Sequence, residues 1–141
     1  MSVRIPEQVR RAAPYAVAVA FSVSGVIHLV RPGVFSPLVP RALPAPTFLV
    51  YASGVAELGC AGGLFAHRTW AGPAAAVLLL AVLPGNVQMA LDAGTGRHPG
   101  LLDNAALAWA RVPLQLPLIW AALQARPMLQ WRGPRRGRAA A

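Results

Sequence analysis

Five polar side chains lie inside otherwise apolar stretches of this sequence, and their types are the ones that could support binding chemistry. They are His28, Glu57, Asn86, Arg111 and Gln115. Polar groups within apolar helices are costly in lipid and usually face a bundle interior or a cavity. A carboxylate and a guanidinium there can pair with each other, hold a polar headgroup or relay a proton. We therefore treat the five residues as a candidate intramembrane binding cluster and assign no catalytic residue.

Glu57 is the clearest member of this cluster because its helical neighbours are all small or polar. The residues three and four positions away are Ser53, Gly54, Cys60 and Ala61. Positions at this spacing share one face of a helix, and small residues on that face permit close helix contact. This face is therefore expected to pack against another helix and not against lipid.

Arg111 is the expected partner of Glu57. Arg111 and Gln115 are four residues apart, so they share one helix face. We expect Glu57 and Arg111 to form an ion pair, with Asn86 and Gln115 satisfying the remaining donors and acceptors. His28 falls near the outer boundary of its helix. The alternative is that a Glu–Arg pair serves only to fix which helices pack together.

Several other kinds of chemistry find no support in the sequence. Cys60 is the only cysteine, which excludes a disulfide or a dithiol relay within one chain. The three histidines, His28, His67 and His98, are far apart, so no metal site is predicted. The net charge of +9 is spread between apolar runs and tails, whereas nucleic-acid binders gather basic residues on one face. No nucleic-acid partner is expected.

The elements that position the five residues are predicted to be membrane helices. Hydrophobic residues make up 56% of the chain and charged residues only 12%. A bilayer core needs roughly 20 apolar residues of helix, and four windows come near that length: 12–30, 48–66, 70–91 and 105–123. The sequence thus predicts an all-α integral membrane four-helix bundle over residues 12–124. Internal prolines predict kinks in the third and fourth helices, at Pro84 and at Pro113 and Pro117.

The distribution of arginine predicts how the bundle is oriented. The segment 1–11, the turn between the second and third spans and the tail 125–141 together carry nine arginines, and the two other loops carry three. By the positive-inside rule both termini are cytoplasmic. All 13 cationic side chains are arginine, which together with the richness in Ala, Gly and Pro is typical of a GC-rich bacterial genome. The predicted location is a bacterial plasma membrane.

The first loop, residues 31–46, contains five prolines, which make a long regular helix there unlikely. Its interleaved apolar residues leave two interpretations open. The segment covers the mouth of the bundle or the interface, or it is a stiff connector.

Several short motifs resemble the DoxX-like family of small bacterial membrane proteins. They are Gly25-Val-Ile-His28, Arg31-Pro32-Gly-Val-Phe35, Leu38-Val39-Pro40, Leu43-Pro44-Ala-Pro46, Tyr51-Ala-Ser53-Gly54-Val-Ala-Glu57 and Arg111-Val-Pro113-Leu-Gln115. Where that family usually has Pro-Ala-Asn, this chain has Pro84-Gly85-Asn86. The resemblance implies a compact four-helix membrane bundle with the five polar positions kept. It also implies a connection with quinone-linked oxidoreductases.

Three functions follow as hypotheses. The first is a non-catalytic accessory or scaffold component of a membrane assembly, with the bilayer and another membrane or redox protein as partners and a homo-oligomer as an option. The second is a quinone-associated subunit of a membrane oxidoreductase system, with the polar cluster at the quinone headgroup. The third is a small transporter or proton-coupled channel. No reaction is expected of the chain on its own.

Overall fold

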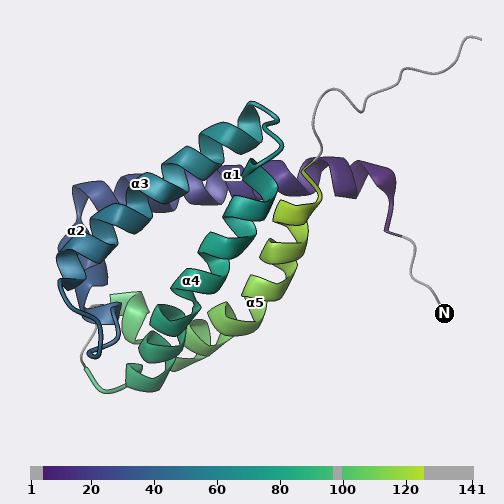
Figure 1. Cartoon of the computed structure of the whole chain (residues 1–141). Helices are drawn as coiled ribbons and strands as arrows, with labels where there is room; N and C mark the ends of the chain where they lie inside the picture. Colours follow the sequence, from purple (N-terminus) through teal and green to yellow (C-terminus); the bar gives the residue numbers. More distant parts are fainter. Residues whose placement is uncertain (1–4, 97–99, 126–141) are drawn as a thin grey trace, which may run out of the picture.

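The computed structural model of this protein describes residues 5–96 and 100–125, and the described part is helical. The helices in chain order are α1 (Glu7–Val30), α2 (Pro32–Phe35), η1 (Ser36–Leu38), α3 (Pro46–Phe65), α4 (Ala71–Asp92), η2 (Gly100–Asp103) and α5 (Ala105–Leu123) (Figure 1). The four long helices are each long and apolar enough to cross a membrane. The predicted all-α integral membrane four-helix bundle is thereby confirmed.

The bounds of the long helices follow the apolar runs closely. Helix α5 has the predicted bounds, and the Asn104 side chain caps it by accepting a hydrogen bond from the backbone N–H of Leu107 at 3.1 Å. Helix α1 begins at Glu7, earlier than the predicted span, because the helix continues into the basic segment that an apolar count leaves out. Arg4, Arg97 and the predicted basic tail from residue 126 lie outside the described residues.

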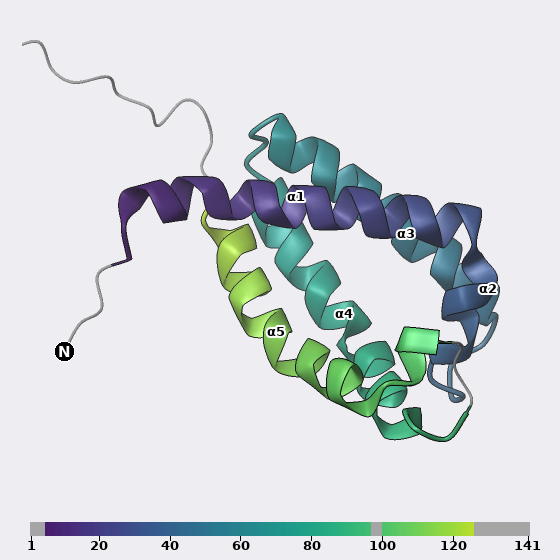
Figure 2. The ribbon, with the colours of Figure 1, turned by 180° about the vertical axis from the view of Figure 1, so that it is seen from behind.

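The four long helices pack in the cyclic order α1, α3, α4, α5. Helix α1 contacts α3 and α5, and α4 contacts the same two helices. Figures 1 and 2 show α1 alongside α3 and α4 alongside α5, as two helix pairs that are close at one end of the molecule and spread toward the other. Helices α3 and α5 are therefore at opposite corners of the bundle, so side chains that both direct inward face a common interior.

Two separate hydrophobic clusters hold the ends of this bundle. The first, which we call the turn-side cluster, lies toward the turn between α3 and α4. It comprises Val17, Ala18, Phe21, Cys60, Ala61, Leu64, Ala71, Ala75, Leu79, Ala121 and Ala122, with Leu118 among the half-buried residues packed against it. The second, the loop-side cluster, comprises Leu38, Met89, Ala90 and Ala108. Most members of the first cluster are small, which lets the helix backbones approach closely.

Large apolar side chains cover the outside of the bundle. Val30 is 70% exposed and Leu116 is 72% exposed, and similar residues recur along all four long helices. Such a surface would be unfavourable in water and suits hydrocarbon. The surface of the molecule therefore agrees with a multi-pass membrane protein.

Prolines lie inside α4 and α5, as predicted. Pro84 lies inside α4, and Pro113 and Pro117 lie inside α5. A proline lacks the N–H that would reach the carbonyl four residues earlier. Figure 1 shows α4, and Figure 2 shows α5, changing direction partway along.

The first loop folds back over one end of the bundle instead of bridging it loosely. Helix α2 and the 3-10 turn η1 contact α3, and η1 also contacts α4. Leu38 at the end of η1 is buried against Met89 and Ala90 of α4 and Ala108 of α5. Of the two interpretations left open by the sequence, the structure supports the one in which this segment covers the bundle mouth.

Candidate functional site

A polar residue lies one helical turn beyond the turn-side cluster on three of the four long helices. Ser24 on α1 is three residues from Phe21, and Glu57 on α3 is three residues from Cys60; both neighbours belong to the turn-side cluster. Gln115 on α5 is three residues from Leu118, which packs against that cluster. Because a helix rises about 1.5 Å per residue, the three polar side chains lie at a similar depth. We call Ser24, His28, Glu57 and Gln115 the polar layer.

Glu57 is the ionisable member of the polar layer that is most completely enclosed. The residue is only 5% exposed. Its Oε2 atom lies 3.6 Å from His28 Nδ1, and the Ser24 hydroxyl lies 3.3 Å from the same nitrogen. Oε2 itself has no hydrogen-bond partner among the described residues. A buried carboxylate oxygen therefore remains available to a further donor.

His28 is held in one orientation by its own helix and by α2. Its Nδ1 atom lies 2.7 Å from the backbone carbonyl oxygen of Ser24. Because a carbonyl only accepts hydrogen bonds, Nδ1 carries the proton and donates it there. The imidazole also stacks on Phe35, with ring centroids 4.0 Å apart and an interplanar angle of 17°. The covering segment of the first loop thus contributes directly to the site.

Two glycines bring α1 and α3 together at this point. A Cβ atom on Gly25 would lie 2.8 Å from the Gly54 carbonyl oxygen, and one on Gly54 would lie 2.8 Å from His28 Cβ. Contacts this short have no room for a methyl group. The absence of side chains at Gly25 and Gly54 is what allows His28 to approach Glu57.

Gln115 supplies a second acceptor from the opposite corner of the bundle. It is 4% exposed, and its Oε1 atom makes no hydrogen bond within the described part of the chain. Buried polar atoms are nearly always paired in folded proteins. Three buried acceptors lack a partner among the described residues: Asp103 Oδ1 in η2, and Glu57 Oε2 and Gln115 Oε1 in the polar layer, where a further group could donate to them.

The expected ion pair between Glu57 and Arg111 is not formed. Arg111 is exposed, and its nearest polar interaction is a hydrogen bond from Nη1 to Met89 Sδ at 3.8 Å. The basic side chain within 4.0 Å of Glu57 is instead that of His28. Arg111 is the seventh residue of α5. A long side chain so near a helix end can extend toward the membrane surface.

Asn86 is also separated from the polar layer along the bundle. It is half-buried and lies three residues before Met89 of the loop-side cluster. The five predicted residues thus divide between two depths. His28, Glu57 and Gln115 belong to the polar layer, whereas Asn86 and Arg111 lie near the loop-side cluster.

Ser24 and Phe35 are members of the site that the sequence reasoning missed. Ser24 is four residues before His28 and hence on the same face of α1. This spacing is a signal that could have been used. The stacking of Phe35 on His28 depends on how the first loop folds back, which local spacing does not encode.

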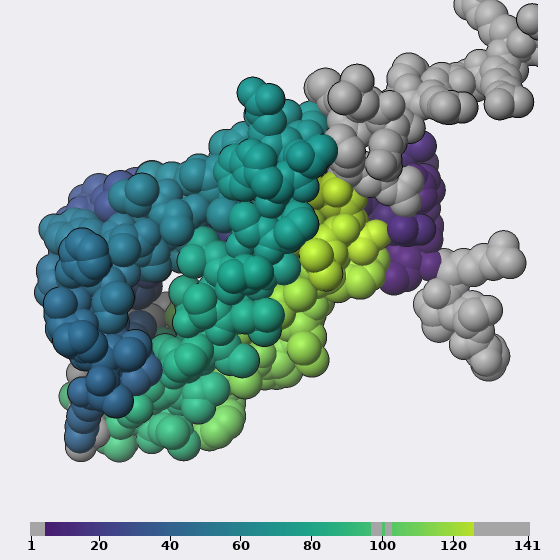
Figure 3. All heavy atoms as spheres, in the orientation of Figure 1, coloured from purple at the N-terminus to yellow at the C-terminus, as the bar shows by residue number. Residues whose placement is uncertain are grey.

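The surface of the molecule is hollowed between α3 and α4. Figure 3 shows this hollow where the two helix pairs spread apart. Both helices carry exposed apolar side chains, such as Val55 and Leu80, which would face lipid in a bilayer.

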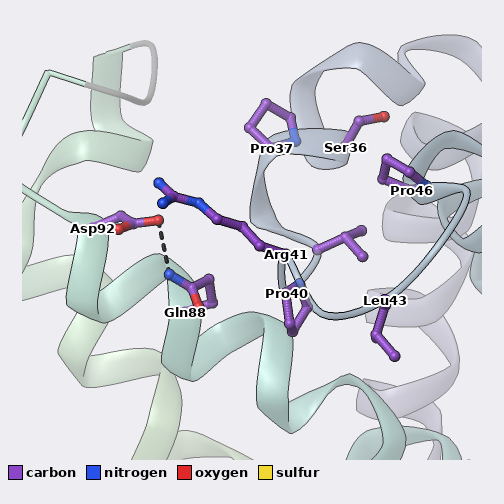
Figure 4. A pocket seen from close by; sticks show the side chains of 9 residues that line it. Ser36, Pro37, Pro40, Arg41, Leu43, Pro46, Gln88 and Asp92 are labelled. Atoms are coloured by element: carbon purple, nitrogen blue, oxygen red, sulfur yellow. Dashed lines mark hydrogen bonds between the residues drawn. The ribbon is translucent and has the colours of Figure 1, made fainter.

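A second recess lies at the first-loop end and does not include the polar layer. It has a volume of about 460 Å³ and is lined by Ser36, Pro37, Val39, Pro40, Arg41, Leu43, Pro46, Gln88 and Asp92. Arg41 extends across it toward α4, where Gln88 Nε2 donates to Asp92 Oδ2 at 3.0 Å (Figure 4). Because Gln88 already donates to the Asp92 carboxylate, the polar layer remains the stronger candidate site.

Metal ligands do not gather in the described part of the chain, where no three His, Cys, Asp or Glu side chains lie close enough to hold an ion. The polar groups present are suited to hydrogen bonding an organic molecule.

Comparison with known proteins gives one match. Residues 17–126 match a family described as Domain of unknown function (DUF8561), a stretch that includes the whole polar layer and all of α3, α4 and α5. No curated protein and no solved structure matches the chain. The family match covers well over half of the sequence, and the chain therefore belongs to the DUF8561 family.

Proposed function

We propose that this protein is a non-catalytic accessory component of a membrane assembly, and that it holds a small amphipathic molecule in the polar layer. The observation that carries the proposal is the pair of buried acceptors without partners, Glu57 Oε2 and Gln115 Oε1. Leaving a buried polar group unsatisfied costs about 1–3 kcal/mol. A bound molecule that supplied the missing hydrogen bonds would remove this cost.

A role in packing alone explains the polar layer less well. The close helix contacts are made elsewhere by small residues: Gly25 against Gly54, and Gly72, whose Cβ would lie 2.6 Å from the Ala122 carbonyl oxygen. The pair expected to fix helix packing, Glu57 with Arg111, is absent from the contacts described above. Of the polar layer, only His28 takes part in these close contacts, at Gly54, and Glu57 and Gln115 lie beside them.

The proposal includes the DoxX-like character, the bacterial plasma membrane and the cytoplasmic termini inferred from the sequence. The motifs and the arginine distribution support these points. The accessory role rests on the single cysteine and the lack of any redox relay in the sequence. A partner protein would supply whatever reaction the assembly performs.

A quinone-associated subunit is the second candidate. The observation in its favour is the contact between two titratable groups, with His28 Nδ1 3.6 Å from Glu57 Oε2. Reduction of a quinone takes up protons, and such a pair beside the headgroup could exchange them. The electrons would come from a partner that contains a redox centre.

The test is to identify the molecules that the protein retains. Wild type, Glu57→Gln and Arg111→Gln are purified in nanodiscs of native lipid, and small molecules extracted from each are compared by mass spectrometry. We expect a molecule that is enriched with wild type and with Arg111→Gln and is depleted with Glu57→Gln, because only Glu57 belongs to the polar layer. Identical lipid profiles from all three proteins would contradict the proposal.

A further inference from the structure

We infer that the molecule held in the polar layer is recognised through its own hydrogen-bond donors, and that its headgroup carries at least two hydroxyl groups. The inference rests on the proposed function, because it names the chemistry of the ligand for the same site. It follows from where the acceptors of the polar layer lie and from how the neighbouring donors of the protein are already used.

The two unpaired acceptors face one interior from opposite corners of the bundle. Glu57 is on α3 and Gln115 is on α5, and both residues are at least nine-tenths buried. Each lies three residues from a residue packed in the turn-side cluster, Cys60 and Leu118 respectively. Both thus lie one helical turn beyond the turn-side cluster, on helices at opposite corners of the bundle.

The protein's own donors near this space are engaged in other contacts. His28 Nδ1 donates to the Ser24 carbonyl oxygen at 2.7 Å. The Ser24 hydroxyl lies 3.3 Å from the same nitrogen and leaves Glu57 Oε2 without a hydrogen-bond partner. Arg111 is exposed and donates to Met89 Sδ. Asn86 is one turn from the loop-side cluster, and no hydrogen bond joins its side chain to Glu57 or Gln115 within the described residues. The donors that Glu57 and Gln115 lack must come from the ligand.

This requirement distinguishes between classes of headgroup. A carbonyl or ether headgroup offers only acceptors. It could accept from the Gln115 amide N–H, but it would leave Glu57 Oε2 and Gln115 Oε1 unpaired. Two hydroxyl groups on one headgroup can point to α3 and α5 at the same time. Hydroxyl groups are also neutral, so the molecule avoids the cost of carrying a charge through the bilayer.

The experiment compares two probes that share one skeleton. 4-Hexylresorcinol has two hydroxyl donors, and its dimethyl ether has the same ring and chain with acceptors only. Binding of each is measured by calorimetry with the protein in nanodiscs, and empty nanodiscs correct for partition into lipid. We expect the dihydroxy probe to bind wild type about tenfold more tightly than the ether, as loss of hydrogen bonds to buried partners predicts.

Variants of Glu57 and Gln115 test whether these two acceptors cause the preference for the dihydroxy probe over the ether. Glu57→Met and Gln115→Met keep the length of each side chain and remove its acceptor. Each is therefore expected to weaken binding of the dihydroxy probe and to reduce its tenfold advantage over the ether. Gln88→Met, in the first-loop recess, is the matched control and should bind both probes as wild type does. Helical circular dichroism checks that each variant folds, and Glu57→Leu, which also lacks an acceptor, serves if Glu57→Met does not fold.

The outcomes separate this inference from the proposed function. Equal binding of the two probes, or tighter binding of the ether, would overturn the donor requirement while the proposed binding role stands. Binding of neither probe would also overturn it. In that case the extraction experiment decides the proposed function by itself, because it does not depend on the chosen probes.

Discussion

At the scale of single residues, Gly25 and Gly54 determine how closely α1 and α3 approach beside the polar layer. A Cβ on Gly54 would lie 2.8 Å from His28 Cβ and 3.1 Å from the Gly25 carbonyl oxygen. Gly59, on the same helix, has open space where its Cβ would be. Gly54 and Gly59 of α3 therefore offer a matched pair, one at the site and one away from it.

Gly54→Ala is expected to destabilise the protein by about 1–3 kcal/mol, because the helices must move apart to admit the methyl group. Gly59→Ala should be neutral or stabilising by up to about 1 kcal/mol, since alanine favours a helix. Unfolding of both variants in detergent, followed by circular dichroism, measures the difference. If Gly54→Ala were as stable as Gly59→Ala, the close crossing of α1 and α3 would not exist.

The burial of Glu57 was predictable from sequence, and its partner was not. Its neighbours Gly54, Cys60 and Ala61 predicted an inward face, and the structure confirms that Glu57 is 5% exposed. The expected partner was Arg111, yet the structure brings His28 to the carboxylate. Helix rotation decides which polar side chains meet. Apolar periodicity leaves rotation undetermined when a helix is apolar on all sides, as these are.

At the scale of elements, the long helices were predictable because membrane helices are bounded by the length of their apolar runs. The bounds of α5 match the prediction, and those of α3 and α4 differ from it by one or two residues. The conformation of the first loop was not predictable from its sequence. The loop is held by contacts of Leu38 with Met89 and Ala108, which are distant in sequence and so cannot be inferred from the local pattern.

Helices α2 and η1 acquire their function from the same long-range contacts. Leu38 anchors the segment to α4 and α5, and Phe35, three residues earlier, stacks on His28. The first loop thereby couples the loop-side cluster to the polar layer. Its prolines limit the conformations of the unfolded segment, which lowers the entropy lost when it folds back.

At the scale of the whole molecule, two hydrophobic clusters enclose a polar interior. The helix pairs are held together at the turn-side cluster and spread toward the other end, where the hollow of Figure 3 opens. Packing of small residues holds the bundle at the turn-side cluster. In the proposed function, the polar layer beyond that cluster would receive a ligand from the membrane.

The orientation of this bundle gives a prediction for intact cells. In a Cys60→Ala background, Leu43→Cys and Thr95→Cys should react with a membrane-impermeant thiol reagent, whereas Thr69→Cys should react only after the cells are opened. The first two sites lie in loops predicted to be outside, and Thr69 lies in the arginine-bearing turn predicted to be cytoplasmic. All three residues are exposed. The reverse labelling pattern would show that the bundle has the opposite orientation.

The central claim is that the polar layer binds a ligand and does not hold the bundle together. The most direct measurement is the free energy of unfolding of the double variant Glu57→Met and Gln115→Met beside wild type, both stripped of bound small molecules. Apolar side chains of similar length remove two unsatisfied acceptors, so we predict that the double variant is as stable as wild type or more stable by about 1–3 kcal/mol. Destabilisation by more than about 1 kcal/mol would show that these residues hold the helices together, and would contradict the claim.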